Sequence, residues 1–252
     1  MSATILPLDV NGLIFEVGRM RLIDRVSFTL RPGTRTVILG PNGAGKSLLL
    51  RLCHGLLRPT AGSVEWRGDA PNPRAHQAMV FQQPVMLRRS AAANLAYVLA
   101  GGGVPRRDRT GLLADALART GLTHLAHTPA RVLSAGEQQR LALARAWITD
   151  PEVIFLDEPT ASLDPAATRA VEDIVLAIHQ TGTTVVLTTH DLGQARRLAE
   201  DVLFLHRGRI LERGPAGAFF DRPATPEARA FIAGELISHD EAERELDAAN
   251  AL

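Results

Sequence analysis

A glycine-rich segment near the N-terminus constrains the fold more than any other feature of the sequence. Residues 40–47 are Gly-Pro-Asn-Gly-Ala-Gly-Lys-Ser, which matches the pattern G-x-x-x-x-G-K-S. The apolar run at 36–39 predicts a strand entering the segment, and the residues from Ser47 to about His54 predict a helix leaving it. In this setting the glycines let backbone N–H groups point at phosphate oxygens at the positive end of a helix. The segment therefore predicts a phosphate-binding loop.

Individual residues of this loop have expected roles. The Lys46 ammonium is expected to reach the β- and γ-phosphates of a nucleotide, and the Ser47 hydroxyl is expected to hold Mg²⁺. Backbone N–H groups around them supply further contacts. The predicted nucleotide-binding residues here are Gly40, Pro41, Asn42, Gly43, Ala44, Gly45, Lys46, Ser47 and Leu48.

Strands and helices alternate through much of the chain. Residues 153–156 and 184–188 are apolar runs typical of buried strands, and residues 165–180 repeat apolar side chains at helical spacing. Residues 202–205 and 209–211 flank a predicted hairpin turn. This alternation predicts an α/β protein with a mainly parallel sheet.

Two regions depart from the alternation. Residues 13–38 are predicted as short strands, and we expect an antiparallel β subdomain there. Residues 85–150 are rich in Ala and Leu, with helical stretches near 106–120 and 134–149. The expected organisation is a P-loop NTPase domain over residues 1–238, with a helical subdomain inserted at about 85–150, and a polar, acidic tail at 239–252.

Two carboxylates end the strand predicted at 153–156. Asp157 and Glu158 would ordinarily be read as surface residues at a strand end, but the phosphate loop changes that preference. Asp157 is then expected near the magnesium ion, directly or through water. Glu158 is expected to polarise the attacking water as a general base.

A capping pattern opens the helix predicted at 134–149. Ser134 is a natural N-cap, and Glu137 three residues later completes a capping box. A helix start with a hydroxyl and small residues, here Ala135 and Gly136, is also suited to phosphate. The structural and the phosphate-binding interpretations are compatible.

These motifs, in this order, resemble those of the ATP-binding cassette family. The resemblance rests on residues 40–47, 133–140 (Leu-Ser-Ala-Gly-Glu-Gln-Gln-Arg) and 155–159 (Phe-Leu-Asp-Glu-Pro), and covers roughly residues 8–235. It implies an ATP hydrolase that uses ATP and Mg²⁺ and pairs head-to-tail with a second ATPase subunit, expected as a homodimer. The start of the helix at 134–149 would then face the γ-phosphate held by the other subunit. Residues 161–164 resemble the family's loop that crosses the dimer seam beside it.

The resemblance also assigns residues that composition and periodicity do not. Gln82, with Gln83 as the alternative, is expected to reach Mg²⁺ and the attacking water. His190, at a strand end and before Asp191, is expected to contact the γ-phosphate and orient the water. The family's adenine-stacking aromatic would fall at Val17 by its usual spacing, and Phe15 is the predicted substitute, with an ordinary core position for Phe15 as the alternative. The expected catalytic residues are thus Lys46, Gln82, Glu158 and His190, the expected metal ligands are Ser47, Gln82 and Asp157, and the expected contacts to the second ATP are Ser134, Ala135, Gly136 and Glu137.

Three residues depart from the family pattern. Ala135 stands where Gly is common, and Glu137 stands where Gln is common, which brings a negative charge toward phosphate unless the carboxylate folds back onto the helix start. Leu48 replaces a common Thr and cannot donate to the α-phosphate. A hydrogen bond to a charged acceptor is worth about 1–3 kcal/mol, so we expect modest ATP affinity.

Composition limits the partners. Twenty-eight basic and 27 acidic residues leave a net charge of +1, which argues against a dedicated nucleic-acid binder. The single Cys53 excludes an internal disulfide and a cysteine-cluster metal site. No apolar run is long enough to cross a bilayer, and the N-terminus does not resemble a secretion signal. Any membrane role would therefore need a partner, and the resemblance implies a peripheral protein on the cytoplasmic face of the cell membrane, working through a separate transmembrane permease subunit.

The resemblance favours an importer of a small polar solute, served indirectly by a solute-binding protein. Residues 81–97 and 219–223 look most like tungstate-type oxyanion importers, with phosphate and polar amino-acid importers as alternatives. Residues 86–90 are expected where the permease docks, although Arg88 and Arg89 are equally consistent with a solvated surface. A non-transport cassette ATPase is a further alternative, but such relatives usually carry two cassettes or a long coiled coil. A GTP switch would need Asn-Lys-x-Asp, which this sequence lacks.

Overall fold

Two β-sheets organise the molecule. The computed structural model describes residues 4–235. A three-stranded antiparallel sheet has the order β2-β1-β4. A six-stranded sheet has the order β5-β6-β7-β3-β8-β9, in which only β9 runs antiparallel to its neighbour. The strands are β1 (Leu8–Val17), β2 (Met20–Leu30), β3 (Arg35–Leu39), β4 (Ala61–Trp66), β5 (Gln77–Val80), β6 (Val153–Asp157), β7 (Thr184–Thr189), β8 (Asp201–His206) and β9 (Arg209–Pro215).

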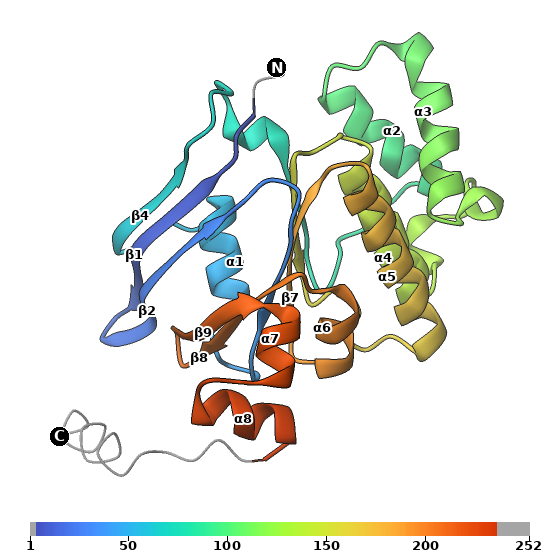
Figure 1. The fold of residues 1–252 in the computed structure, drawn as a ribbon. Coiled ribbons are helices and arrows are strands. Elements are labelled where there is room, and N and C mark those ends of the chain that lie inside the picture. Colours follow the sequence, from blue (N-terminus) through green and yellow to red (C-terminus); the bar gives the residue numbers. More distant parts are fainter. Residues whose placement is uncertain (1–3, 236–252) are drawn as a thin grey trace.

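Helices cover both faces of the large sheet (Figure 1). Figure 1 shows α1 between the two sheets, whereas α4 and α5 lie together on the opposite side of the large sheet and α2 and α3 project beyond its edge. The α-helices are α1 (Lys46–His54), α2 (Ala91–Gly101), α3 (Arg106–Arg119), α4 (Ala135–Trp147), α5 (Pro165–Gln180), α6 (Leu192–Leu198), α7 (Ala216–Asp221) and α8 (Pro226–Ala233). Short 3₁₀ turns are η1 (Pro73–His76), η2 (Thr123–Leu125) and η3 (Ala130–Val132).

The core follows from the alternation of side chains along the strands. Successive residues of a strand face opposite sides of the sheet. In β3, Val37 and Leu39 are buried in the cluster that includes α4 and α5. Ile38, between them, is buried in the cluster that includes α1 and the antiparallel sheet. The large sheet is therefore apolar on both faces, as expected for a parallel sheet flanked by helices.

The predicted fold class is confirmed. The sheet is mainly parallel, the N-terminal strands form an antiparallel sheet, and helices α2, α3 and α4 lie in the chain between β5 and β6. The helix expected at 165–180 is α5, with its apolar stripe buried. The domain boundaries stay predictions, and the expected tail at 239–252 lies outside the described residues.

Several elements escaped sequence analysis. Helix α2 was expected only as part of an Ala- and Leu-rich region, although Ser90 caps it by accepting from the Ala93 N–H at 3.3 Å. Strand β4 begins with Ala61-Gly62, and all its later residues are only half-buried, so it has little apolar patterning. Helices α6 and α7 are too short for their periodicity to be distinctive. Within residues 4–235, every helix is too short or too polar to cross a membrane.

Candidate functional site

The carboxyl ends of three adjacent parallel strands create one site. β6, β7 and β3 are neighbours in the large sheet, and parallel strands place their carboxyl ends at the same edge. The loops that follow them carry Glu158, His190 and Lys46. A cavity of about 750 Å³ opens there. Its lining residues are Asn42, Gly43, Gly45, Lys46, Ser47, Leu48, Gln82, Glu158, Thr160, Ala161, Ser162, Leu163, Thr168, Thr189, His190, Asp191 and Gln194.

The glycine loop is shaped by close backbone packing. Gly45 has φ +100° and directly precedes α1. A Cβ added there would lie 2.9 Å from Cδ1 of Ile23, so both conformation and space require glycine. A Cβ on Gly40 would collide with the backbone oxygen of Leu205. The β8 backbone therefore packs directly against the loop that follows β3.

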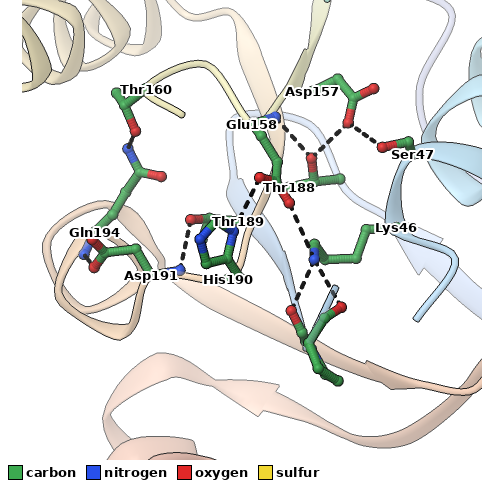
Figure 2. A network of polar contacts seen from close by, with 12 residues as sticks. Lys46, Ser47, Asp157, Glu158, Thr160, Thr188, Thr189, His190, Asp191 and Gln194 are labelled. Atoms are coloured by element: carbon green, nitrogen blue, oxygen red, sulfur yellow. Dashed lines mark hydrogen bonds and ion pairs between the residues drawn. The ribbon is translucent and has the colours of Figure 1, made fainter. Parts of the chain in front are cut away.

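Lys46 is held between the loop and a carboxylate. Its Nζ donates to the carbonyl oxygens of Gly40 at 2.9 Å and Pro41 at 3.0 Å. The same Nζ lies 3.2 Å from Oε1 of Glu158, and Oε2 of Glu158 lies 3.0 Å from Nδ1 of His190 (Figure 2). Lys46, Glu158 and His190 thus form one continuous chain of polar contacts along the cavity.

Asp157 forms a second polar pair beside this chain. It is 2% exposed, and its Oδ1 accepts from Ser47 Oγ at 2.6 Å and from Thr188 Oγ1 at 3.0 Å (Figure 2). Its Oδ2 lies 3.7 Å from Nη2 of Arg51. Carboxylate and hydroxyl oxygens are the hard donors that Mg²⁺ prefers, so the pair suits that ion. Residues 4–235 contain no group of three or more His, Cys, Asp or Glu side chains that could hold a metal, so substrate phosphates and water would have to complete the coordination.

The predicted residues of the loop and of the strand ends lie together at this site. Lys46, Ser47, Leu48, Gln82, Glu158 and His190 all line the cavity, and Asp157 lies buried against Ser47. Gly40, Pro41 and Ala44 lie within the same loop without lining the cavity. The roles of these residues stay predictions.

Phe15 is not brought to the cavity. It is partly buried and packs against the core cluster that contains α1 and the antiparallel sheet. Val17, the position given by the family's usual spacing, is 58% exposed at the end of β1. An adenine contact from Phe15 is therefore unsupported by its packing, and its assignment stays a prediction.

The start of α4 also lies apart from the cavity lining. The Ser134 N–H donates to Oε2 of Glu137 at 2.8 Å, and the Glu137 N–H donates to Ser134 Oγ at 3.4 Å, so the capping box is complete. The hydrogen bond from the Ser134 backbone lowers the pKa of Glu137. The Glu137 carboxylate therefore folds back onto the helix start. Ala135 is exposed.

Gly136 has a packing role that sequence analysis missed. It is buried, and a Cβ added to it would lie 2.7 Å from the Cβ of Ala167 in α5. The glycine therefore permits close contact between α4 and α5, whatever it contributes to a ligand.

Sequence analysis also missed Thr160 and Gln194, which line the cavity and are joined by a 2.7 Å hydrogen bond. The available signal was positional. Thr160 follows Asp-Glu-Pro at the end of β6, and Gln194 follows His190 by four residues on a helix capped by Asp191.

Comparisons with known proteins agree with this geometry. The family model described as "ABC transporter" matches residues 23–161. The chain is 36% identical to the tungstate uptake system ATP-binding protein TupC of Peptoclostridium acidaminophilum, over 84% of this chain and 99% of that protein. It is 37% identical to the methionine import ATP-binding protein MetN of Cereibacter sphaeroides, over 82% of this chain and 62% of that protein.

A solved structure shares the fold. The cbiO1 protein of Clostridium perfringens, described as part of the ABC transporter complex cbiONQ, superposes with a TM-score of 0.77 at 26% identity. The superposition covers 86% of this chain and 91% of that one. The resemblance inferred from the sequence motifs is thereby confirmed. The chain belongs to the ABC transporter family, as an ATP-binding and ATP-hydrolysing subunit.

Proposed function

We propose that this subunit energises the uptake of a small polar solute, tungstate or a related oxyanion, through a separate permease subunit. The observation that carries the catalytic part is the continuous contact chain Lys46–Glu158–His190 beside the Ser47–Asp157 pair, all at one sheet edge. These groups combine a cation, a base, an orienting imidazole and hard oxygen donors. That combination suits phosphoryl transfer from ATP to water.

Each side chain then has a defined task. Lys46 contacts the β- and γ-phosphates, while Glu158 accepts a proton from the attacking water and His190 orients that water. Ser47, Asp157 and Gln82 would hold Mg²⁺, directly or through water. The ion would neutralise developing charge on the phosphate oxygens.

The start of α4 supports a site shared between two subunits. Ser134, Ala135 and Glu137 are at least partly exposed but do not line the chain's own cavity. The N-terminus of a helix favours anions. In a head-to-tail homodimer, residues 134–137 would contact the ATP held by the partner, and the loop at 161–164 would lie at the same seam.

The oxyanion assignment has one specific support. The similarity to the tungstate ATPase extends over 99% of that protein. The methionine import ATPase, matched over 62% of its length, favours an amino acid as the second candidate. In either case this subunit would act through the permease and a solute-binding protein.

A surface beside Gln82 suits permease docking at the cytoplasmic face of the membrane. Val85 is 75% exposed and Tyr97 is 56% exposed, and the Arg89 guanidinium lies 5.6 Å from the Tyr97 ring. Arg88 and Arg89 are exposed, whereas Met86 is buried and supports the surface from beneath. The segment at 81–97 therefore offers apolar and cationic side chains to a partner.

The shared site can be tested by dilution. If each ATP needs two subunits, turnover should rise with the square of protein concentration when dimers are scarce. A concentration-independent specific activity together with a monomer on a sizing column would contradict sharing.

The solute can be tested with the co-purified permease and candidate binding proteins. Tungstate-loaded protein should stimulate ATP turnover, and stimulation by methionine-loaded protein alone would favour the second candidate.

A further inference from the structure

Gln194 occupies an unusual place beside the proposed catalytic groups. It is 1% exposed, lines the cavity, and lies on α6 four residues after His190. Its backbone N–H donates to the Asp191 carboxylate at 2.8 Å, which caps α6 (Figure 2). Gln194 is therefore anchored to the same strand-to-helix turn that carries His190.

The side chain of Gln194 reaches a second loop. Its Nε2 donates to Thr160 Oγ1 at 2.7 Å and to Glu172 Oε1 at 3.4 Å. Glu172, buried on α5, is held in turn by two hydrogen bonds from Arg197, at 2.8 and 2.7 Å. The contact with Glu172 identifies the end of the amide that carries the nitrogen, because a carboxylate can only accept. The buried Oε1 of Gln194 has no hydrogen-bond partner in the described structure.

The loop that Gln194 reaches has an unfavourable backbone. Glu158 has φ +44° and Ser162 has φ +64°, which place both residues in the left-handed backbone region. Residues other than glycine rarely adopt this region. Such conformations persist only where surrounding contacts hold them. Within residues 4–235, backbone bonds from Ala161 to Glu158 and from Leu163 to Thr160 close the loop on itself. Within the part of the chain that the structure describes, one side-chain hydrogen bond anchors residues 159–163, the contact between Thr160 and Gln194.

We propose that Gln194 is a positioning residue that fixes the loop at 158–163 relative to His190, and so sets the orientation of Glu158. The proposal rests on the proposed function, because it assigns Gln194 to the geometry of that reaction. The Glu158 N–H already donates to Thr188 Oγ1 of β7 at 2.9 Å, and the Gln194 amide adds a second link, from α6 to the middle of the loop, through its hydrogen bond to Thr160. Losing this link leaves ATP contacts at Lys46 and Ser47 in place but lets the Glu158–His190 pair drift.

The first test compares variants of matching shape. Gln194→Met keeps the length of the side chain but removes the amide, and Thr160→Val removes the hydroxyl oxygen at constant shape. In the full chain, each should lower kcat about 10-fold and leave KM for ATP within about two-fold, because misplaced groups slow the chemical step more than binding. Thr160→Ser, which restores the oxygen, should keep kcat within about two-fold of wild type.

A double variant separates positioning from general damage. If one hydrogen bond carries the effect, the double variant Gln194→Met with Thr160→Val should have a kcat within about two-fold of that of each single variant. Gln77→Met is the matched control, because Gln77 also has a buried oxygen without a hydrogen-bond partner but lies at the start of β5, away from the cavity. It should keep wild-type kcat.

Two outcomes would overturn the proposal. One is wild-type kcat in Gln194→Met or Thr160→Val, and the other is a double variant about 100-fold slower, as independent losses would give. If Gln194→Met does not fold, Thr160→Val and Thr160→Ser carry the test alone. Glu158→Gln distinguishes failure of the proposed function from failure of the proposed role of Gln194. Full turnover in that variant would defeat the proposed function itself, whereas an inactive Glu158→Gln beside a fully active Gln194→Met would defeat only this inference.

Discussion

The phosphate-loop cluster and the start of α4 use their polar groups in opposite ways. In the cluster, Lys46, Glu158 and His190 follow three different strands, and Glu158 contacts both of the others beside a cavity. At the start of α4, Ser134 and Glu137 are three residues apart and satisfy each other in a local capping box. The cluster depends on tertiary structure, whereas the capping box needs only one turn of helix.

In the proposed shared site, this difference explains how the two motifs would divide one reaction. The cluster contains the proposed base and cation of hydrolysis within a single chain. The α4 start contributes only a helix terminus, a hydroxyl and small residues, which bind an anion but perform no proton transfer. Changes to the cluster should therefore abolish chemistry in each chain, and changes at the α4 start should weaken pairing around ATP.

The largest effect is expected at Lys46, the only lysine of the sequence. Lys46→Ala should reduce ATP turnover by about 10³-fold or more, because it removes a buried cation from the expected position of the β- and γ-phosphates. Lys46→Arg, which keeps the charge, should also be strongly impaired, because the compact ammonium bonds two carbonyl oxygens that a planar guanidinium cannot match. Steady-state ATPase assays on folded protein test both. Full turnover in Lys46→Ala would end the phosphate-loop assignment.

Glu158→Gln should be the next largest change. It keeps a side chain that can contact His190 but removes the base, so turnover should fall about 10²–10⁴-fold while ATP still binds. With ATP, this variant should elute from a sizing column as a dimer. Adding Ser134→Ala should reduce the dimer fraction without restoring turnover. An ATP-bound monomer at every concentration would contradict the proposed division between the two regions.

Gly136→Ala tests whether packing or phosphate explains the glycine of α4. The new Cβ would lie 2.7 Å from the Cβ of Ala167, and overpacking of this kind costs about 1–3 kcal/mol. Urea denaturation should show this loss. Adding Ala167→Gly removes the opposing methyl group and should restore most of the lost stability. The new glycine at position 167 has its own helix penalty of about 1 kcal/mol, so the double variant should stay below wild type by about that amount. If the double variant is as unstable as the sum of the two singles, the contact with α5 is not the reason for the glycine.

The same contrast explains what the sequence could predict. The capping box and the phosphate loop are local patterns, so Ser134, Glu137, Lys46 and Ser47 were recognisable from spacing alone. The fold class followed from apolar runs that alternate with a helical stripe. Thr160 and Gln194 could not be paired in this way, because their contact depends on the adjacency of β6 and β7 and on a buried amide. Packing also placed Phe15 against the core, which spacing along a strand cannot decide.

Glu137 offers the smallest effect and a test by pH. Hydrogen bonding from the Ser134 backbone lowers the pKa of Glu137 in the folded chain. A lowered folded pKa means that the carboxylate stabilises the fold above its unfolded pKa, near 4.3, and that this contribution disappears as the pH falls through the folded pKa. Near pH 7, Glu137→Gln should therefore lower the free energy of unfolding by about 0.3–1 kcal/mol relative to wild type. Denaturation followed at several pH values should show this difference shrinking below about pH 4.

The same substitution should have the opposite effect on pairing. At pH 7, Glu137→Gln removes a negative charge from the proposed contact with the partner's γ-phosphate, so ATP should drive dimerisation at about two- to five-fold lower concentration. Glu227→Gln is the matched control, since Glu227 also lies in the first turn of a helix, α8, outside the proposed seam. It should leave pairing unchanged. Weaker pairing in Glu137→Gln would mean that the α4 start serves the ATP site mainly through its capping geometry. The Glu137 carboxylate would then stabilise the helix rather than oppose ATP-driven dimerisation.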